Sequence, residues 1–143
     1  VHCLLYQGRY NLFNREPEAQ GILRQAQENG TGFIAFSPLA QGLLTNRYLN
    51  GIPEDSRIAR GGFLKKEQLT DQVLNKIKAL NEVAGSRGQT LAEMALAWIL
   101  KDDLVTSVII GASSVSQLAD NLKATENCKF SPDELQRIGS ILQ

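Results

Sequence analysis

Short apolar runs alternate along the chain with longer segments of helical spacing. The apolar runs cover residues 1–6, 32–36 and 105–110, and runs of this length bounded by glycine, proline or serine are typical of buried strands. The segment from about 17 to 29 has a helical pattern and ends at Asn29-Gly30, a common helix stop. Two strands joined by such a helix are expected to pair in parallel through a right-handed crossover.

The middle of the chain is less regular. Residues 39–62 follow no period for long and are interrupted by glycine and proline. A segment of this kind in a compact domain is usually functional or disordered. Helical spacing returns over residues 66–86 and breaks again at 85–88.

Three further helices are expected in the second half. Thr90 with Glu93, and Ser131 with Glu134, have the spacing of capping boxes, and the second pair encloses a proline at the first helical position. Another helix is expected to be capped near Ser113 or Ser114. The residues expected on the inner faces of the three helices are Leu91, Ala95 and Trp98, then Leu118 and Leu122, and then Leu135, Ile138 and Leu142.

This order of elements predicts an α/β fold, with a parallel sheet covered by helices. Three strands are few for a parallel sheet, which is buried on both faces, so the sheet is expected to be incomplete. The chain also opens at Val1, without Met, in an apolar run. We therefore interpret residues 1–143 as a single-domain fragment of a longer protein.

Composition narrows the classes of function. The 143 residues include fifteen basic and fifteen acidic ones, and a net charge of zero argues against a nucleic-acid partner. No apolar run approaches the roughly 18 residues of a membrane span. Cys3 and Cys128 lack CxxC spacing, which favours a reducing compartment, the cytoplasm.

Familiar catalytic signatures are missing. The single histidine, His2, has no evident partner for general-base chemistry, so a structural role is favoured. One histidine and two distant cysteines are too few ligands for zinc. The sequence contains no GxSxG, Walker A or GxGxxG motif.

Candidate binding residues instead follow the three predicted strands, where parallel α/β proteins bind ligands. They are Gln7, residues 36–40 and residues 111–113. An amide at Gln7 suits another amide, and Phe36 offers a flat ring for stacking. Ser113 leads into a helix whose backbone N–H groups favour an anion.

Three arginines of the middle segment, Arg47, Arg57 and Arg60, are candidates for holding a phosphate. Each candidate alone has a plain structural interpretation, as core residue, helix cap or solvated charge. Together they match a nucleotide with an amide ring at one end and phosphates at the other, which is the shape of a nicotinamide dinucleotide.

Segments 7–15, 35–45 and 110–121 resemble the C-terminal part of aldo-keto reductases. The likeness favours the branch of bacterial L-glyceraldehyde 3-phosphate reductases and potassium-channel β subunits, and residues 51–53 and 56–57 point the same way. The resemblance implies a (β/α)8 TIM barrel of which this chain supplies strands 6–8. It also implies NADP(H), extended across the carboxyl ends of the strands.

The resemblance assigns each cofactor contact to a position of this chain. Gln7 would bond the nicotinamide carboxamide, and Phe36 would stack on or near its ring. The residues implied for the phosphates are Ser37, Leu39, Ala40 and Gln41, with Pro38 among them, together with Arg47 and, for the 2′-phosphate, Arg57. The residues implied around the adenosine are Gly111, Ser113, Gln117, Asp120 and Asn121, of which Asp120 stands where relatives often carry Glu.

Family chemistry uses an Asp, Tyr, Lys and His tetrad that this chain does not contain. Tyr6, Tyr10, Tyr48 and His2 match none of its positions, so no catalytic residue and no metal ligand is assigned here. The intact protein is expected to reduce small aldehydes or ketones, such as glyceraldehyde 3-phosphate or methylglyoxal, and the resemblance allows for a homo-oligomer.

Two alternatives stay open. One is a regulatory or scaffold subunit of the channel-β type that keeps the cofactor site. The other is an inactive truncated product, and we expect the isolated chain not to reduce aldehydes because it lacks a suitable proton donor.

Overall fold

The computed structural model describes residues 2–54, 61 and 66–143. Its strands are β1 (Leu5–Arg9), β2 (Gly32–Phe36) and β3 (Ser107–Val108). Its α-helices are α1 (Glu16–Ala19), α2 (Ile22–Glu28), α3 (Asp71–Ser86), α4 (Leu91–Ile99), α5 (Val115–Leu122) and α6 (Pro132–Leu142). Four short 3₁₀ helices complete the order, η1 (Ala40–Gly42), η2 (Asn46–Tyr48), η3 (Lys66–Gln68) and η4 (Lys123–Glu126).

The strands form one parallel sheet in the order β1-β2-β3. Leu5 pairs with Gly32 and Arg9 with Phe36, while Ile34 of β2 pairs with Ser107 of β3. The predicted parallel α/β arrangement is thus confirmed. A sheet of three parallel strands with two open edges is consistent with a portion of a barrel.

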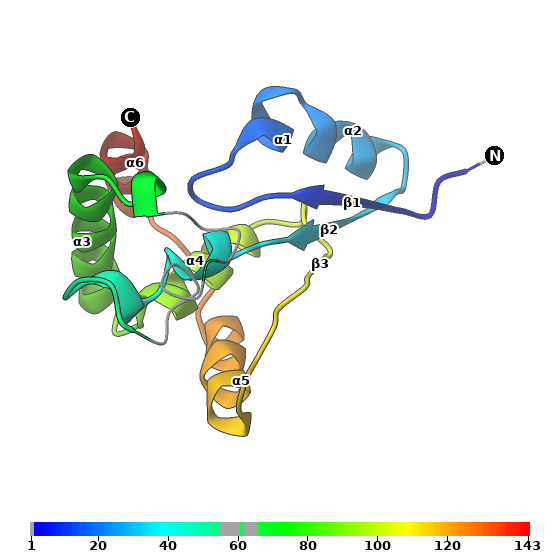
Figure 1. The fold of residues 1–143 in the computed structure, drawn as a ribbon. Helices are drawn as coiled ribbons and strands as arrows, with labels where there is room; N and C mark the ends of the chain where they lie inside the picture. The colour runs from blue at the N-terminus through cyan, green and yellow to red at the C-terminus, as the bar shows by residue number, and fades with distance from the viewer. Residues whose placement is uncertain (1, 55–60, 62–65) are drawn as a thin grey trace.

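The helices gather on two sides of this sheet (Figure 1). Helices α1 and α2 lie beside β1 and β2, with α2 packed on β2. At the carboxyl ends of the strands, α3 packs against both α4 and α6. Helix α5 follows β3 and projects from the lower part of the molecule. Helices α4 and α6 are therefore joined into one packed group through α3, whereas α5 lies at the outside of the molecule.

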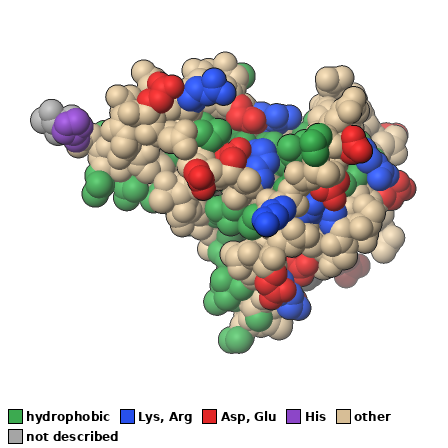
Figure 2. Space-filling model, turned by 180° about the vertical axis from the view of Figure 1, so that it is seen from behind, with side chains coloured by type: hydrophobic (Ala, Val, Ile, Leu, Met, Phe, Trp, Pro, Cys, Tyr) green, Lys and Arg blue, Asp and Glu red, His purple; other side chains and the backbone are tan. Residues whose placement is uncertain are grey.

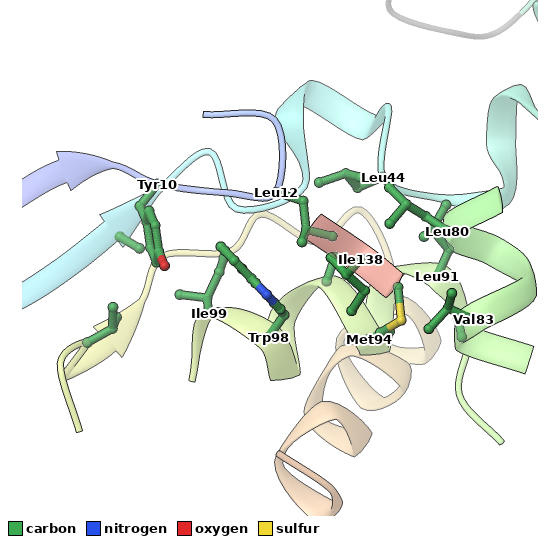
Figure 3. Close-up of a cluster of buried hydrophobic side chains, with 14 of the residues drawn as sticks. Tyr10, Leu12, Leu44, Leu80, Val83, Leu91, Met94, Trp98, Ile99 and Ile138 are labelled. Atoms are coloured by element: carbon green, nitrogen blue, oxygen red, sulfur yellow. The ribbon is translucent and has the colours of Figure 1, made fainter. Parts of the chain in front are cut away.

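The main core lies between the sheet and α4, and it continues to α3 and α6 (Figure 3). Trp98 of α4 and Tyr10, which follows β1, have ring centroids 5.3 Å apart. Phe33 of β2 meets the Tyr10 ring edge-on at 6.3 Å. The further labelled core residues are Leu12, Leu44, Leu80, Val83, Leu91, Met94, Ile99 and Ile138. Apolar burial of this kind is the main stabilising contribution.

Both predicted capping boxes are present. The Thr90 hydroxyl accepts a bond from the amide of Glu93, whose carboxylate accepts one from the Thr90 amide. Ser131 and Glu134 make the same pair of bonds at the start of α6. Helix α4 turns Leu91, Ala95 and Trp98 inward as predicted.

The first strand differs from its prediction over residues 1–6. It runs from Leu5 to Arg9, so Gln7 lies in its middle and not at its end. Sheet pairing continues past Gln7 because β2 still supplies partners there, Ala35 for Gly8 and Phe36 for Arg9. The Phe33 ring packs over Gly8, where a Cβ would lie 2.8 Å from that ring. The strand is also exposed, with Leu5 51% accessible, because β1 is an edge strand. His2 is exposed and lies outside the strand.

The single helix predicted over residues 17–29 is two helices. The break falls at Gln20 and Gly21, and Gly21 has φ +71°, a conformation that glycine adopts without steric strain. Helix α2 ends before Asn29-Gly30 as predicted. The apolar spacing continues across the break, so the pattern alone did not reveal it.

The second half contains two further corrections. The strand predicted over 105–110 has ladder pairing only at Ser107–Val108, because its partner β2 ends at Phe36, where the chain turns away at Ser37. Helix α5 begins after Ser114 as predicted, but Leu118 and Leu122 are 42% and 57% exposed. In α6, Ile138 is buried, whereas Leu135 is 37% exposed.

The middle segment contains η1 and η2 within residues 39–54. Arg57 and Arg60, both predicted phosphate ligands, lie outside the described residues. In the part of the chain that the structure describes, no helix has the length and apolarity needed to cross a membrane.

Candidate functional site

A hollow of about 480 Å³ opens where the loop after β2 meets the segment after β3. Its lining comes from three separate parts of the sequence. The lining residues are Ser37, Pro38, Leu39, Gln41, Gly42, Thr45, Arg47, Ile109, Ile110, Gly111, Ser113, Ser114 and Gln117. We call this hollow the main groove. It lies at the carboxyl ends of parallel strands, where ligands of α/β proteins bind.

A second hollow of about 290 Å³ extends the main groove along α5. The two share Leu39, Thr45 and Gln117 as walls. Asp120 and Asn121 line this extension, together with residues from the start of α4. The two hollows give an elongated surface, longer than a compact ligand would need.

The structure brings together most of the predicted cofactor residues. Those that line the main groove are Ser37, Pro38, Leu39, Gln41, Arg47, Gly111, Ser113 and Gln117. Asp120 and Asn121 line its extension, and Ala40 lies in the same loop without lining either hollow. Arg57 is outside the described residues.

Gln7 and Phe36 are not part of either hollow. Gln7 is exposed on the edge strand β1, where its backbone pairs with Ile34. Phe36 is half-buried, and the Arg9 guanidinium lies 5.8 Å from the centre of its ring. The predicted nicotinamide end is therefore separate from the groove that holds the other candidates.

The loop after β2 has an unusual backbone. Ser37, Ala40 and Gln41 have φ values of 52°, 48° and 60°, in the left-handed region that residues with a Cβ avoid at a cost of roughly 1–2 kcal/mol each. Strain of this kind gathers at functional sites and persists only when the surroundings impose it. The sequence contains no signal of this conformation, because none of the three residues is glycine.

Backbone bonds hold this loop in a tight double turn. The Ser37 carbonyl accepts a bond from Ala40 at 3.1 Å. The Leu39 carbonyl accepts from Gly42 at 2.9 Å and from Leu44 at 3.1 Å. We call residues 37–42 the strained loop. Its turns place several backbone groups along one wall of the main groove.

Thr45 lines the groove, although no role was predicted for it. Its hydroxyl donates to the Gly42 carbonyl at 2.6 Å and accepts from the Arg47 amide at 3.3 Å. It thereby caps η2 and connects the strained loop to the position of Arg47. Threonine is a common cap at the start of a helix. Its position two residues before Arg47 is therefore a weak sequence signal for this role.

The start of α5 is arranged differently from the predicted anion site. Ser114 caps the helix by accepting from the Gln117 amide at 3.1 Å. The Gln117 side-chain oxygen accepts from the Ser113 amide at 2.7 Å and from the Ser113 hydroxyl at 2.9 Å. The Ser113 amide is therefore already bonded within the chain, and it becomes available to a ligand only if Gln117 turns away.

Asp120 and Asn121 differ in what they can offer a ligand. Lys123 donates to Asp120 at 2.7 Å, and this hydrogen bond raises the pKa of the Lys123 ammonium. Asn121 is 7% exposed, and its side-chain nitrogen has no hydrogen-bond partner in the described structure. Buried polar groups are normally satisfied, so this amide is suited to meeting an acceptor on a ligand.

A buried ionisable cluster lies outside the groove, around Tyr10 and Lys101. Tyr10 is 1% exposed, and burial raises the pKa of its phenol. The Lys101 ammonium lies 3.5 Å from the Tyr10 hydroxyl and 4.0 Å from the Trp98 ring centre; burial lowers its pKa. Tyr10 lies in the core and lines neither hollow of the groove. Among the described residues, no cluster of His, Cys, Asp and Glu could hold a metal.

The chemistry of the groove is that of binding. It combines an arginine, hydroxyl groups, exposed backbone and a buried unpartnered amide along an elongated surface. Such a set suits a ligand with phosphate groups and a polar ring. No described side chain in it has the arrangement of a nucleophile with its base or of an activated proton donor.

Comparisons with known proteins cover the whole chain. The model of the Aldo/keto reductase family matches residues 1–143. An L-glyceraldehyde 3-phosphate reductase of Escherichia coli O157:H7 is 52% identical over 142 residues, which cover 96% of this chain and 41% of that protein. A probable voltage-gated potassium channel subunit beta of Arabidopsis thaliana is 37% identical over 147 residues, covering 100% of this chain and 45% of that protein.

A solved structure agrees with these relatives. A crystal structure of a thermostable aldo-keto reductase with the inhibitor epalrestat matches with a TM-score of 0.66 and 28% identity. The match covers 96% of this chain and 39% of that one. The chain thus spans less than half the length of these relatives. By sequence and by fold, this chain belongs to the aldo/keto reductase family.

Proposed function

We propose that this chain provides most of the NADP(H) site of a reductase that acts on small aldehydes or ketones. The observation that carries the proposal is the convergence on one elongated groove of Ser37, Pro38, Leu39, Gln41, Arg47, Gly111, Ser113 and Gln117. These segments follow β2 and β3, and parallel strands bring such segments to the same edge of a sheet. The family membership supports carbonyl reduction as the reaction of the intact protein.

The proposed fold is the C-terminal portion of a (β/α)8 barrel, with β1, β2 and β3 as strands 6, 7 and 8. Residues 1–143 form one partial domain in this proposal. The two open edges of the sheet support it, since a closed barrel leaves no edge unpaired. A reducing, cytoplasmic setting and a homo-oligomeric intact protein are part of the same proposal.

In this proposal, different parts of the chain bind different parts of the cofactor. The strained loop and Arg47 would hold the pyrophosphate, and Arg57 would approach the 2′-phosphate. Gln117, Asp120 and Asn121 would surround the adenosine, with the unpartnered Asn121 amide donating to the base. Gln7 and Phe36 would meet the nicotinamide end beyond the main groove.

When bound, NADPH supplies the hydride that reduces a carbonyl carbon. This chain would fix the cofactor along the carboxyl ends of the strands and hold its phosphates away from the reacting end. The described residues provide no proton donor for the carbonyl oxygen, so that group would come from outside them. The name of the Escherichia coli relative supports a phosphorylated small aldehyde as substrate, and methylglyoxal is a further candidate.

A second candidate function is a cofactor-binding regulatory subunit. It is favoured by the 37% identity to a probable potassium channel subunit beta. Both candidates need the same groove, so groove residues do not separate them. Steady-state turnover of the intact protein with small aldehydes would separate them, because only the reductase oxidises NADPH at a useful rate.

The binding proposal is tested by titrating NADPH into the chain and following nicotinamide fluorescence. Arg47→Ala should weaken binding about tenfold, or about 1.4 kcal/mol, through loss of a charge-assisted phosphate contact. Arg24→Ala is the matched control, since Arg24 is exposed on α2 and lines a different hollow. Absence of NADPH binding by the unmodified chain contradicts the proposal, as does equal binding by the two variants.

A further inference from the structure

Asn11 joins two loops that are far apart in the sequence. Its side-chain nitrogen donates to the Ser37 carbonyl at 2.9 Å, across 26 positions of the chain. Its side-chain oxygen accepts from the amides of Phe13 at 2.9 Å and Asn14 at 2.8 Å. Asn11 itself is only 2% exposed, so the three bonds satisfy the polar atoms of a buried side chain.

The turn around Asn11 is itself rigid. The backbone amides and carbonyls of Asn11 and Asn14 exchange two bonds, each of 3.1 Å. These two bonds and the two bonds to the side-chain oxygen fix the orientation of the Asn11 side chain, so its nitrogen donates in one direction only. That direction leads to Ser37.

Ser37 is the first residue of the strained loop and has a φ of 52°. Its carbonyl accepts from Asn11 on one side and from the Ala40 amide on the other. A left-handed serine persists only where its surroundings impose the conformation. Asn11 supplies such a constraint from outside the loop, and it does so without lining the main groove.

We propose that Asn11 is a positioning residue that holds the strained loop in the shape required to bind the pyrophosphate of the cofactor. The bond to Ser37 fixes the loop before the ligand arrives, so ordering of the loop does not oppose binding. This inference rests on the proposed function for the identity of the ligand. The constraint on the loop itself stands on the geometry of the ligand-free chain.

Two substitutions separate the bond to Ser37 from the local turn. Asn11→Asp keeps an oxygen for the amides of Phe13 and Asn14 but has no N–H to donate, and its charge repels the Ser37 carbonyl. Asn11→Ser keeps a weaker form of the turn and is too short to reach Ser37. Asn14→Ser is the matched control, because in the described structure Asn14 forms its hydrogen bonds through its backbone N–H and carbonyl.

The first measurement is amide hydrogen exchange in the full 143-residue chain without ligand. Both Asn11 variants should exchange the amides of Ala40, Gly42 and Leu44 about tenfold faster than the unmodified chain, while those of α4 are unchanged. The Asn14 variant should match the unmodified chain.

The second measurement is calorimetric binding of NADP+ and of adenosine 2′-monophosphate, which lacks the pyrophosphate. The Asn11 variants should bind NADP+ about tenfold more weakly and adenosine 2′-monophosphate within about twofold of the unmodified chain.

Unchanged exchange in the strained loop overturns the inference, and so does unchanged NADP+ affinity. Equal losses for both ligands, with faster exchange throughout the chain, would reduce Asn11 to a general structural role and also overturn it. If the unmodified chain binds neither ligand, the proposed function fails, and the exchange measurement alone decides whether Asn11 constrains the loop.

Discussion

Helices α4 and α5 begin with the same kind of cap but differ in how far their residues are buried. Each is capped by a hydroxyl side chain, Thr90 for α4 and Ser114 for α5. In α4 every residue from Glu93 to Ile99 is buried, whereas in α5 only Asn121 is. Local capping therefore determines where a helix starts but not what covers it, which depends on neighbouring elements.

The same contrast divides the molecule. Helices α3, α4 and α6 enclose a core in which Leu80, Met94 and Ile138 are fully buried. By comparison, Leu4 at the sheet edge is 78% exposed and Val115 of α5 is 86% exposed. Apolar side chains gather on the lower projection and beneath the N-terminal extension in Figure 2. We refer to these two parts as the enclosed part and the open part.

Arg87 connects elements within the enclosed part. Its guanidinium donates to the carbonyls of Asn127 and Lys129 and to the carboxylate of Glu134, at 3.2, 3.0 and 2.8 Å. It stacks 3.7 Å from the centre of the Phe130 ring, and its side chain is 2% exposed. This arginine attaches the segment before α6 to the turn between α3 and α4.

The largest contrast is expected from two identical truncations. Leu80→Ala should lower the free energy of unfolding by about 3 kcal/mol, because it opens a cavity in a packed core. Leu122→Ala, at a position 57% exposed, should lower it by less than about 0.5 kcal/mol. Urea denaturation followed by circular dichroism measures both. Equal effects would mean that the open part is packed in solution.

A smaller contrast is expected from two arginines. Arg87→Ala should lower the free energy of unfolding by about 2 kcal/mol, because it removes a buried guanidinium that donates to three acceptors and stacks on the Phe130 ring. Arg137→Ala removes an exposed pair with Glu82 at 3.7 Å and should change it by less than about 0.5 kcal/mol. The same denaturation experiment applies. A loss at Arg87 no larger than at Arg137 would show that the bonds to Asn127 and Lys129 add little.

The smallest change in the free energy of unfolding is expected for substitutions in the open part. These substitutions should instead change self-association. The double variant Val115→Lys with Leu122→Lys should leave the free energy of unfolding within about 0.5 kcal/mol and reduce self-association in sedimentation velocity, because exposed apolar patches drive association. Gln72→Lys with Asn75→Lys adds the same charge to the polar face of α3 as a control. Equal reduction by both pairs would assign the effect to net charge.

Much of the fold could be predicted because its signals are local. The capping boxes at Thr90 and Ser131 and the helix stop at Asn29-Gly30 are properties of neighbouring residues, and each was confirmed. The strand boundaries were predicted wrongly, because they depend on contacts between residues distant in the sequence. Pairing of Gly8 and Arg9 with Ala35 and Phe36 of β2 extended β1 past Gln7, and β3 pairs with β2 only at Ser107 and Val108 because β2 ends at Phe36.

The candidate site was predictable in part for the same reason. Residues 37–41 and 111–117 follow strands, and parallel strands place such segments at one edge of the sheet. The exact arrangement was not predictable. The Gln117 side chain accepts a hydrogen bond from the Ser113 amide, and the Asn11 side chain donates one to the Ser37 carbonyl from another loop. Neither bond could be predicted, because these groups meet only once the backbone has brought them together.

By itself, the sequence determined the order of strands and helices apart from the break at Gln20 and Gly21, the capped helix starts and the segments that carry binding chemistry. These follow from spacing, caps and family resemblance, which act over a few residues or are read directly from the residues themselves. Only the tertiary structure decided which apolar faces are enclosed, that the strained loop adopts left-handed conformations, and that separate segments share one groove. The physical reason is that burial and backbone strain depend on contacts between residues distant in sequence, which no local pattern contains.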